Sequence, residues 1–168
     1  MLEENSFYFI KDTYFRDFPD KGLIKNHEVI DGKKHGRPCF YAFKDSKNPD
    51  IYWLIPVSSN IAKYKALHEH KTKRYGRCDT IYLGNIKGKE CAFLIQNLCP
   101  VTEKYIESQY IIQDKPIKIN YTLQKLLIKS SRRVLSITEK GAIKGLIFPD
   151  VKKIKQELIE QIEQEKKR

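Results

Sequence analysis

Two consecutive serines, followed by a lysine and a histidine, are the part of this sequence best suited to chemistry. Ser58 and Ser59 come directly after an apolar run, and Lys63 and His70 follow in a stretch with helical spacing. Hydroxyl groups can hold a phosphate, an ammonium group can neutralise charge that develops on it, and imidazole carries protons at neutral pH. Such a set could bind and cleave a phosphodiester of RNA.

A helix would bring these side chains to one side. At about 100° per residue, a helix that continues from Asn60 places Ser59, Lys63 and His70 on one polar side, whereas Tyr64 falls on the apolar side. RNA cleavage without a metal requires a base for the ribose 2′-hydroxyl, positive charge for a phosphorane-like transition state and an acid for the leaving 5′-oxygen. Serines are also common helix caps, and the sequence leaves that plainer interpretation open.

A second basic segment lies upstream, in a turn that leads into an apolar strand. It contains Lys33, Lys34, His35 and Arg37. Arg37 could contact a phosphate through two N–H groups, and because a guanidinium is a poor base we predict a phosphate clamp rather than a proton carrier. His35 joins His70 and Lys65 as a candidate proton donor. A solvated loop is the alternative interpretation of this turn.

The charge of the chain indicates its partner. Lys and Arg number 32 against 21 Asp and Glu, for a formal charge of +11, which favours a nucleic acid. Two stretches hold the surplus: residues 61–77 carry six bases and one acid, and residues 115–144 carry eight and one. We predict RNA contacts from the bases of both stretches, from the upstream turn and from two tyrosines: Lys33, Lys34, Lys71, Lys73, Arg74, Arg77, Lys118, Lys125, Lys129, Arg132, Arg133, Tyr14 and Tyr64.

Other classes of function fit the sequence poorly. No apolar run approaches the roughly 18 residues of a spanning helix, and the acidic amino terminus does not resemble a signal peptide, so we expect a cytoplasmic protein without a membrane partner. His68 and His70 are two residues apart and point to different sides of a helix, with no acidic or Cys cluster to complete a metal site. No phosphate-binding glycine motif is present. We predict no cofactor and no metal.

The hydrophobic pattern predicts an α+β fold. Short β-branched and aromatic runs separated by polar turns predict antiparallel strands at residues 7–10, 38–43, 51–57, 80–86 and 91–95. Apolar residues at spacings of three and four predict helices at about 117–138 and from 151 onward. A chain of 168 residues fits one domain, with a strand-rich core at about 5–113 and a helical part at about 115–168.

The order of these motifs resembles a known family. FYFIKDTYF, RPCFYAF, IYWLIPVSS, NIAKYK and TIYLGNIKGKECAFLIQNLCPV, followed by a helical tail, are similar to the ToxN/AbiQ/CptN endoribonuclease toxins, with the CptN branch looking closest. The distinctive part of the match covers about residues 8–105. The helical remainder agrees in layout rather than in residues.

The resemblance implies a fold and an activity. It implies a compact, strongly twisted antiparallel sheet related to the Kid/MazF toxins and decorated by helices. It also implies a sequence-preferring, metal-independent endoribonuclease of a type III toxin–antitoxin system, whose products end in a 2′,3′-cyclic phosphate and a 5′-hydroxyl. The implied partners are cellular mRNA and a pseudoknotted RNA antitoxin cut from a repetitive transcript. Toxin and RNA would form closed cyclic assemblies, with no DNA partner.

The resemblance also assigns roles to residues. The hydroxyl pair of the family falls on Ser58 and Ser59, and its active-site lysine on Lys63, with Lys65 as the alternative because the spacing departs from the ToxN pattern. Arg37 stands where ToxN-like members have a lysine, and Tyr14 matches the tyrosine of the amino-terminal motif. We therefore predict an RNA-cleaving toxin. A non-catalytic basic RNA-binding protein is the main alternative, and a basic protein–protein adaptor is a third.

Overall fold

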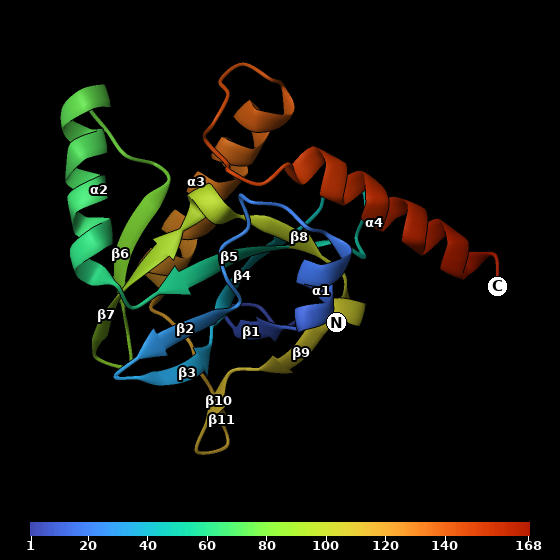
Figure 1. The fold of residues 1–168 in the computed structure, drawn as a ribbon, viewed down its shortest axis with the longest axis horizontal. Coiled ribbons are helices and arrows are strands. Elements are labelled where there is room, and N and C mark those ends of the chain that lie inside the picture. Colours follow the sequence, from blue (N-terminus) through green and yellow to red (C-terminus); the bar gives the residue numbers. More distant parts are fainter.

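The computed structural model describes residues 1–168 and is built around one antiparallel sheet. The strands lie in the order β6-β7-β5-β4-β1-β9, and β8 pairs with β5 beside that path (Figure 1). The predicted α+β fold with antiparallel strands is confirmed, and the five predicted strands are present with ends that differ by no more than two residues. The strands of the sheet are β1 (Phe7–Ile10), β4 (Cys39–Lys44), β5 (Tyr52–Ser58), β6 (Ile81–Ile86), β7 (Lys89–Leu94), β8 (Cys99–Val101) and β9 (Ile106–Gln109).

Strand β5 positions the serines because it runs through the middle of the sheet and ends at Ser58. All seven of its residues are buried. One edge pairs with β4, while on the other edge the first three residues pair with β8 and the last two with β7. Alternate side chains face opposite sides of the sheet, so Trp53 and Ile55 lie in one core cluster and Leu54 in another. Extensive pairing and packing therefore fix the point at which the chain leaves the sheet.

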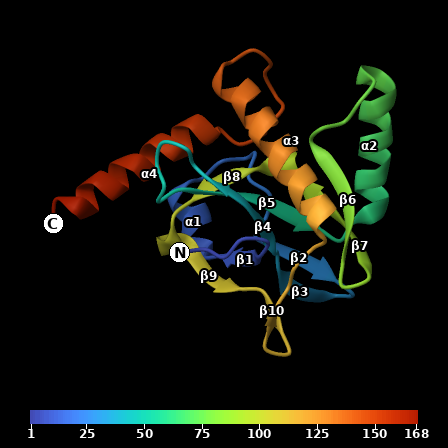
Figure 2. The ribbon, with the colours of Figure 1, turned by 180° about the vertical axis from the view of Figure 1, so that it is seen from behind.

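Four helices surround the sheet: α1 (Asp12–Asp17), α2 (Ile61–Tyr75), α3 (Tyr121–Glu139) and α4 (Val151–Lys166). Helix α3 crosses one face of the sheet, as Figure 2 shows, and buries Leu123 and Leu127 against Phe93 and other residues of the larger cluster. Helix α4 packs Ile154 and Leu158 into the second cluster. Helix α2 stands beside β6 (Figure 1). None of the helices combines the length and apolar character that crossing a membrane requires.

Helix α3 starts later than predicted. The sequence pattern predicts a helix from about residue 117, but residues 117–120 are not helical, and both Ile117 and Ile119 are buried in the larger cluster. The helix begins after Asn120, whose side chain accepts a hydrogen bond from the Leu123 N–H at 2.8 Å. An N-cap of this kind defines a helix start more sharply than apolar spacing does.

The sequence pattern did not predict two small ribbons or the short helix α1. One ribbon consists of β2 (His27–Ile30) and β3 (Lys33–Gly36), and the other of β10 (Ile111–Ile112) and β11 (Lys115–Pro116). Neither ribbon is hydrogen-bonded into the main sheet as a strand. The β2–β3 hairpin turns at Asp31 and Gly32, which both have positive φ. This hairpin supplies the residue that completes the site described next.

Candidate active site at the end of β5

Four hydrogen-bond donors converge where β5 ends and α2 begins, and the carboxylate of Glu28 on β2 accepts from all of them. The Ser58 hydroxyl donates to Oε2 at 2.9 Å and the Ser59 hydroxyl to Oε1 at 2.7 Å. The Ser59 N–H lies 3.2 Å from both oxygens. The Arg37 guanidinium donates through Nη1 to Oε2 at 3.0 Å. The donors therefore form a site for an anion that presents two oxygens.

Arg37 is fixed in place by the backbone around it. The residue is only 7% exposed. Its Nε donates to the Lys25 carbonyl at 2.7 Å, and its Nη1 also donates to the Val57 carbonyl at 3.0 Å. Because a buried charged group needs such partners, these bonds hold both its position and its charge. The geometry suits the predicted role of an anion clamp.

At the start of α2, different residues cap the helix and bind the anion. Asn60 is the N-cap, and its side chain accepts a hydrogen bond from the Lys63 N–H at 3.4 Å. Ser58 supports the turn as well, since its Oγ accepts from the Asn60 N–H at 3.1 Å. The Ser59 hydroxyl takes no part in the cap and is exposed. The capping interpretation therefore applies to Asn60, and the Ser59 hydroxyl is left for Glu28 or for a ligand.

The electrostatics of the site favour a negative group. Burial alone would raise the pKa of the Glu28 carboxyl, but the hydrogen bonds from Ser59 and Ser58 and the charge of Arg37 outweigh burial and lower it. The amino-terminal end of α2 adds further partial positive charge. At neutral pH the site therefore holds an ionised carboxylate.

A cleft of about 610 Å³ opens beside these donors. Its walls come from the β2–β3 hairpin, the end of β5 and the first turn of α2, and they include Lys63 and Tyr64. Lys63 is exposed, and its ammonium group lies 5.3 Å from the centre of the Tyr64 ring. The structure thus brings together five of the predicted site residues: Ser58, Ser59, Lys63, Arg37 and Tyr64.

None of the three remaining candidate proton donors lines the cleft, although His35 lies next to Glu28 in the hairpin. Lys65 forms an ion pair with Glu90 at 2.7 Å and does not line the cleft. His70 is exposed on the predicted side of α2, but it follows Lys63 by seven residues, roughly 10 Å along the helix axis, and is also absent from the cleft wall. His35 pairs with Glu28 across the hairpin and is exposed. The helical wheel places His70 on the same side of α2 as Lys63, but it gives no distance along the helix axis.

The structure contradicts the prediction that Tyr14 contacts RNA. This side chain is fully buried, its hydroxyl donates to the Pro100 carbonyl at 2.8 Å, and its ring packs against Tyr105 and Phe18. Tyr14 belongs to the second core cluster because α1 turns its apolar side inward. In this structure the ring is therefore not accessible to an RNA base.

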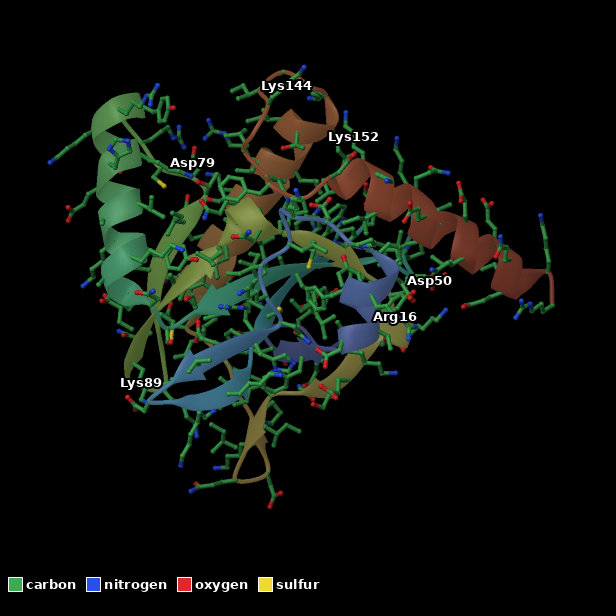
Figure 3. All side chains as sticks on the ribbon, viewed as in Figure 1. Arg16, Asp50, Asp79, Lys89, Lys144 and Lys152 are labelled. Atoms are coloured by element: carbon green, nitrogen blue, oxygen red, sulfur yellow. The ribbon has the colours of Figure 1, made fainter.

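Several predicted RNA-binding bases already have partners within the protein. Lys71 donates to Thr80 and Gln96, at 3.1 and 3.0 Å. Lys118 reaches two backbone carbonyls near the amino terminus. Asp79, labelled in Figure 3, pairs with both Arg77 and Arg133. The other predicted bases are exposed, on β3, α2 and α3: Lys33, Lys34, Lys73, Arg74, Lys125, Lys129 and Arg132.

The sequence analysis missed Glu28 and the partner of His27. His27 Nε2 lies 2.9 Å from Asp12 Oδ1, and that carboxylate also accepts from Asn26 at 2.8 Å. His27 borders both the cleft and a neighbouring hollow of about 880 Å³ between α1 and β2. No signal in the sequence connects residues 12, 28 and 58, because only the path of the hairpin brings them to one place.

The structure contains no group of three or more His, Cys, Asp or Glu side chains arranged to hold a metal ion. All four cysteines are free thiols, and Cys39 and Cys99 are buried. The functional groups gathered at the end of β5 are two hydroxyls, a guanidinium, an ammonium group and a carboxylate.

Comparison with known proteins identifies the fold. No protein-family model matches the chain, and no curated protein matches it in sequence. Among solved structures, the fold is similar to that of AbiQ, a lactococcal anti-phage endoribonuclease belonging to the type-III toxin–antitoxin system. The TM-score is 0.65 at 18% sequence identity, over 96% of this chain and 99% of AbiQ. The similarity thus extends over nearly the whole of both chains.

Proposed function

We propose that this protein is a metal-independent endoribonuclease that acts as the toxin of a type III toxin–antitoxin system. The observation that carries the proposal is the set of donors around Glu28, which is built to hold a two-oxygen anion at the edge of an open cleft. The shared fold with AbiQ supports the same activity. The formal charge of +11 supports a polyanionic substrate.

The proposed reaction is cleavage of a single-stranded RNA by its own 2′-hydroxyl. The scissile phosphate takes the place of the Glu28 carboxylate and accepts hydrogen bonds from Ser58, Ser59 and Arg37. The 2′-hydroxyl releases its proton to water as its oxygen attacks phosphorus, and these donors and the nearby Lys63 stabilise the added negative charge. The bond to the 5′-oxygen then breaks, and Lys63 supplies the proton that this oxygen takes. The products are a 2′,3′-cyclic phosphate and a 5′-hydroxyl.

The same proposal covers the biological partners. An RNA antitoxin made of pseudoknot repeats, cut from a longer transcript by the toxin itself, would occupy the basic surface and block the cleft, and cellular mRNA would be the target. Cyclic toxin–RNA assemblies follow from the family resemblance rather than from a surface of this chain. Cleavage in the cytoplasm fits such a target.

The test is cleavage of single-stranded RNA by the purified protein in excess EDTA. We expect shortened products with cyclic phosphate ends, and no cleavage by a variant in which both Ser58 and Ser59 are replaced by Ala. Loss of activity in EDTA, or products with a 3′-hydroxyl, would contradict the mechanism. Salt-dependent RNA binding without any cleavage would favour a non-catalytic RNA-binding protein instead.

A further inference from the structure

We infer that Glu28 is an internal competitor for the RNA phosphate, and that its carboxylate must leave the end of β5 before RNA can bind there. This inference rests on the proposed function, since it concerns how the substrate reaches the same donors. It assigns a specific role to a carboxylate that otherwise opposes the binding of an anion.

The hydrogen bonds at the site make the two states mutually exclusive. Each serine hydroxyl has one proton to donate, and in this structure both protons point to Glu28, at 2.9 Å for Ser58 and 2.7 Å for Ser59. The Ser59 N–H is also committed to this carboxylate. A phosphate can therefore gain these three donors only if the carboxylate leaves.

Charge reinforces the exclusion. A phosphate that entered beside an ionised carboxylate would lie within a few ångströms of a like charge in a partly buried site, which is costly. Once Glu28 has moved, the same phosphate would face Arg37 and Lys63 without that repulsion. The site thus has a net attraction for RNA only in the open arrangement.

The hairpin is attached to the rest of the protein in a way that permits this movement. Its base is held by the bond from the Arg37 N–H to the Asn26 carbonyl and by the contact between His27 and Asp12. Beyond Glu28, residues 29–35 make hydrogen bonds only within the hairpin. Val29, near the tip, is 73% exposed. Glu28 is therefore the hydrogen-bonded contact that holds the outer part of the hairpin against the body.

Competition by Glu28 means that its replacement should strengthen the binding of RNA. When the carboxylate fills the site, only the open fraction of the protein can bind RNA, and the apparent affinity is the intrinsic affinity multiplied by that fraction. Minor states commonly have populations of roughly 0.1–10%. Glu28→Gln removes the charge that holds the hairpin closed and keeps the size of the side chain. We expect it to bind RNA about tenfold or more tightly than the natural protein, because the open fraction rises.

The experiment measures dissociation constants for single-stranded RNA in which every 2′-hydroxyl is methylated, so that binding is separate from cleavage. Glu90→Gln is the matched control, since it changes the net charge equally but breaks a surface pair with Lys65 outside the cleft. We expect less than about a twofold effect from this control, because surface pairs contribute little. Glu28→Asp, too short to reach both serines, should lie between the natural protein and Glu28→Gln.

A Glu28→Gln variant that binds no more tightly than Glu90→Gln would overturn the inference, because Glu28 would then only position Arg37 and the serines. Separate measurements of kcat and KM for Glu28→Gln on cleavable RNA give a second test. Competition predicts a lower KM, whereas a positioning role predicts a lower kcat. Should Glu28→Gln fail to fold, Glu28→Asp must still bind more tightly than the natural protein. Failure of the proposed function is distinct, since it would appear as absence of cleavage by the natural protein.

Discussion

Replacement of Ser59 by Ala separates chemistry from helix capping. The Ser59 hydroxyl makes one hydrogen bond to a charged acceptor, at 2.7 Å, and takes no part in the N-cap of α2. Hydrogen bonds to charged groups contribute about 1.5–3 kcal/mol, which corresponds to a loss of about 10- to 150-fold in the rate of cleavage. In the free protein the side chain is exposed, so water can replace the lost hydroxyl on Glu28, and the free energy of unfolding should change by less than about 0.5 kcal/mol.

The loss is expected in kcat rather than in KM. The same hydroxyl holds Glu28 in the free protein, so its removal weakens the competitor and the substrate phosphate together. Those two effects offset each other in binding, whereas stabilisation of the transition state has no such offset. Initial rates at several RNA concentrations in excess EDTA separate the two constants.

Asn60→Ala is the matched comparison because it changes the adjacent residue and removes the cap. We expect it to lower the free energy of unfolding by about 1 kcal/mol, measured in urea, and to retain most of the cleavage rate. The reasoning is refuted if Ser59→Ala cleaves at the natural rate, or if it loses as much stability as Asn60→Ala. In either case the Ser59 hydroxyl would have only the structural role that helix-start serines often have.

Two other predictions follow from contacts in the structure. Lys63→Ala should weaken RNA binding and reduce the slope of log affinity against log salt by about 1, whereas Lys65→Ala should leave this slope unchanged, as a salt titration of binding would show. Asp45→Asn should cost about 1.5–3 kcal/mol of unfolding free energy at pH 7, because it removes the charge that the buried carboxylate presents to the partly exposed Lys155 at 2.8 Å. Burial raises the pKa of Asp45, but hydrogen bonds from Lys155 and Trp53 outweigh it and lower that pKa. This contribution is therefore complete above the usual value of 3.8 and disappears as the pH falls through the lower folded value, so denaturant curves of the two proteins should converge in acid.

Apolar pattern explains why most of the sheet could be predicted. The residues of β4 and β5 and the second half of β7 are largely buried, so selection for burial leaves aromatic and β-branched runs that are visible in the sequence. The β2–β3 hairpin has no such run, because five of its eight strand residues are charged or His and both strands are largely exposed. Its pairing depends on a turn at Asp31 and Gly32 and on contacts at its base. Neither feature produces a periodic pattern of apolar residues in the sequence.

The candidate site was predictable only in the part that is local in sequence. Ser58, Ser59 and Lys63 fall within six residues, and a strand followed by a cap-like turn indicates a helix start that can bind an anion. Arg37 was recognised by its chemistry, as a bidentate donor ahead of a strand. The position of His70 could not be judged in the same way, because a helical wheel reports direction around the axis and omits the roughly 10 Å along it.

Glu28 could not be predicted from the sequence as part of this site. In a basic protein, an isolated Glu between His27 and Val29 gives no hint of importance, and its charge even argues against a place in a phosphate site. The structure reverses that argument. Arg37 already donates to the carbonyls of Lys25 and Val57, so the guanidinium has neutral partners without Glu28. The position of the Glu28 carboxylate, within hydrogen-bonding distance of both serines, is then better explained by a set of donors suited to a phosphate. Because Glu28 lies on a separate hairpin, the donors can exchange its carboxylate for RNA.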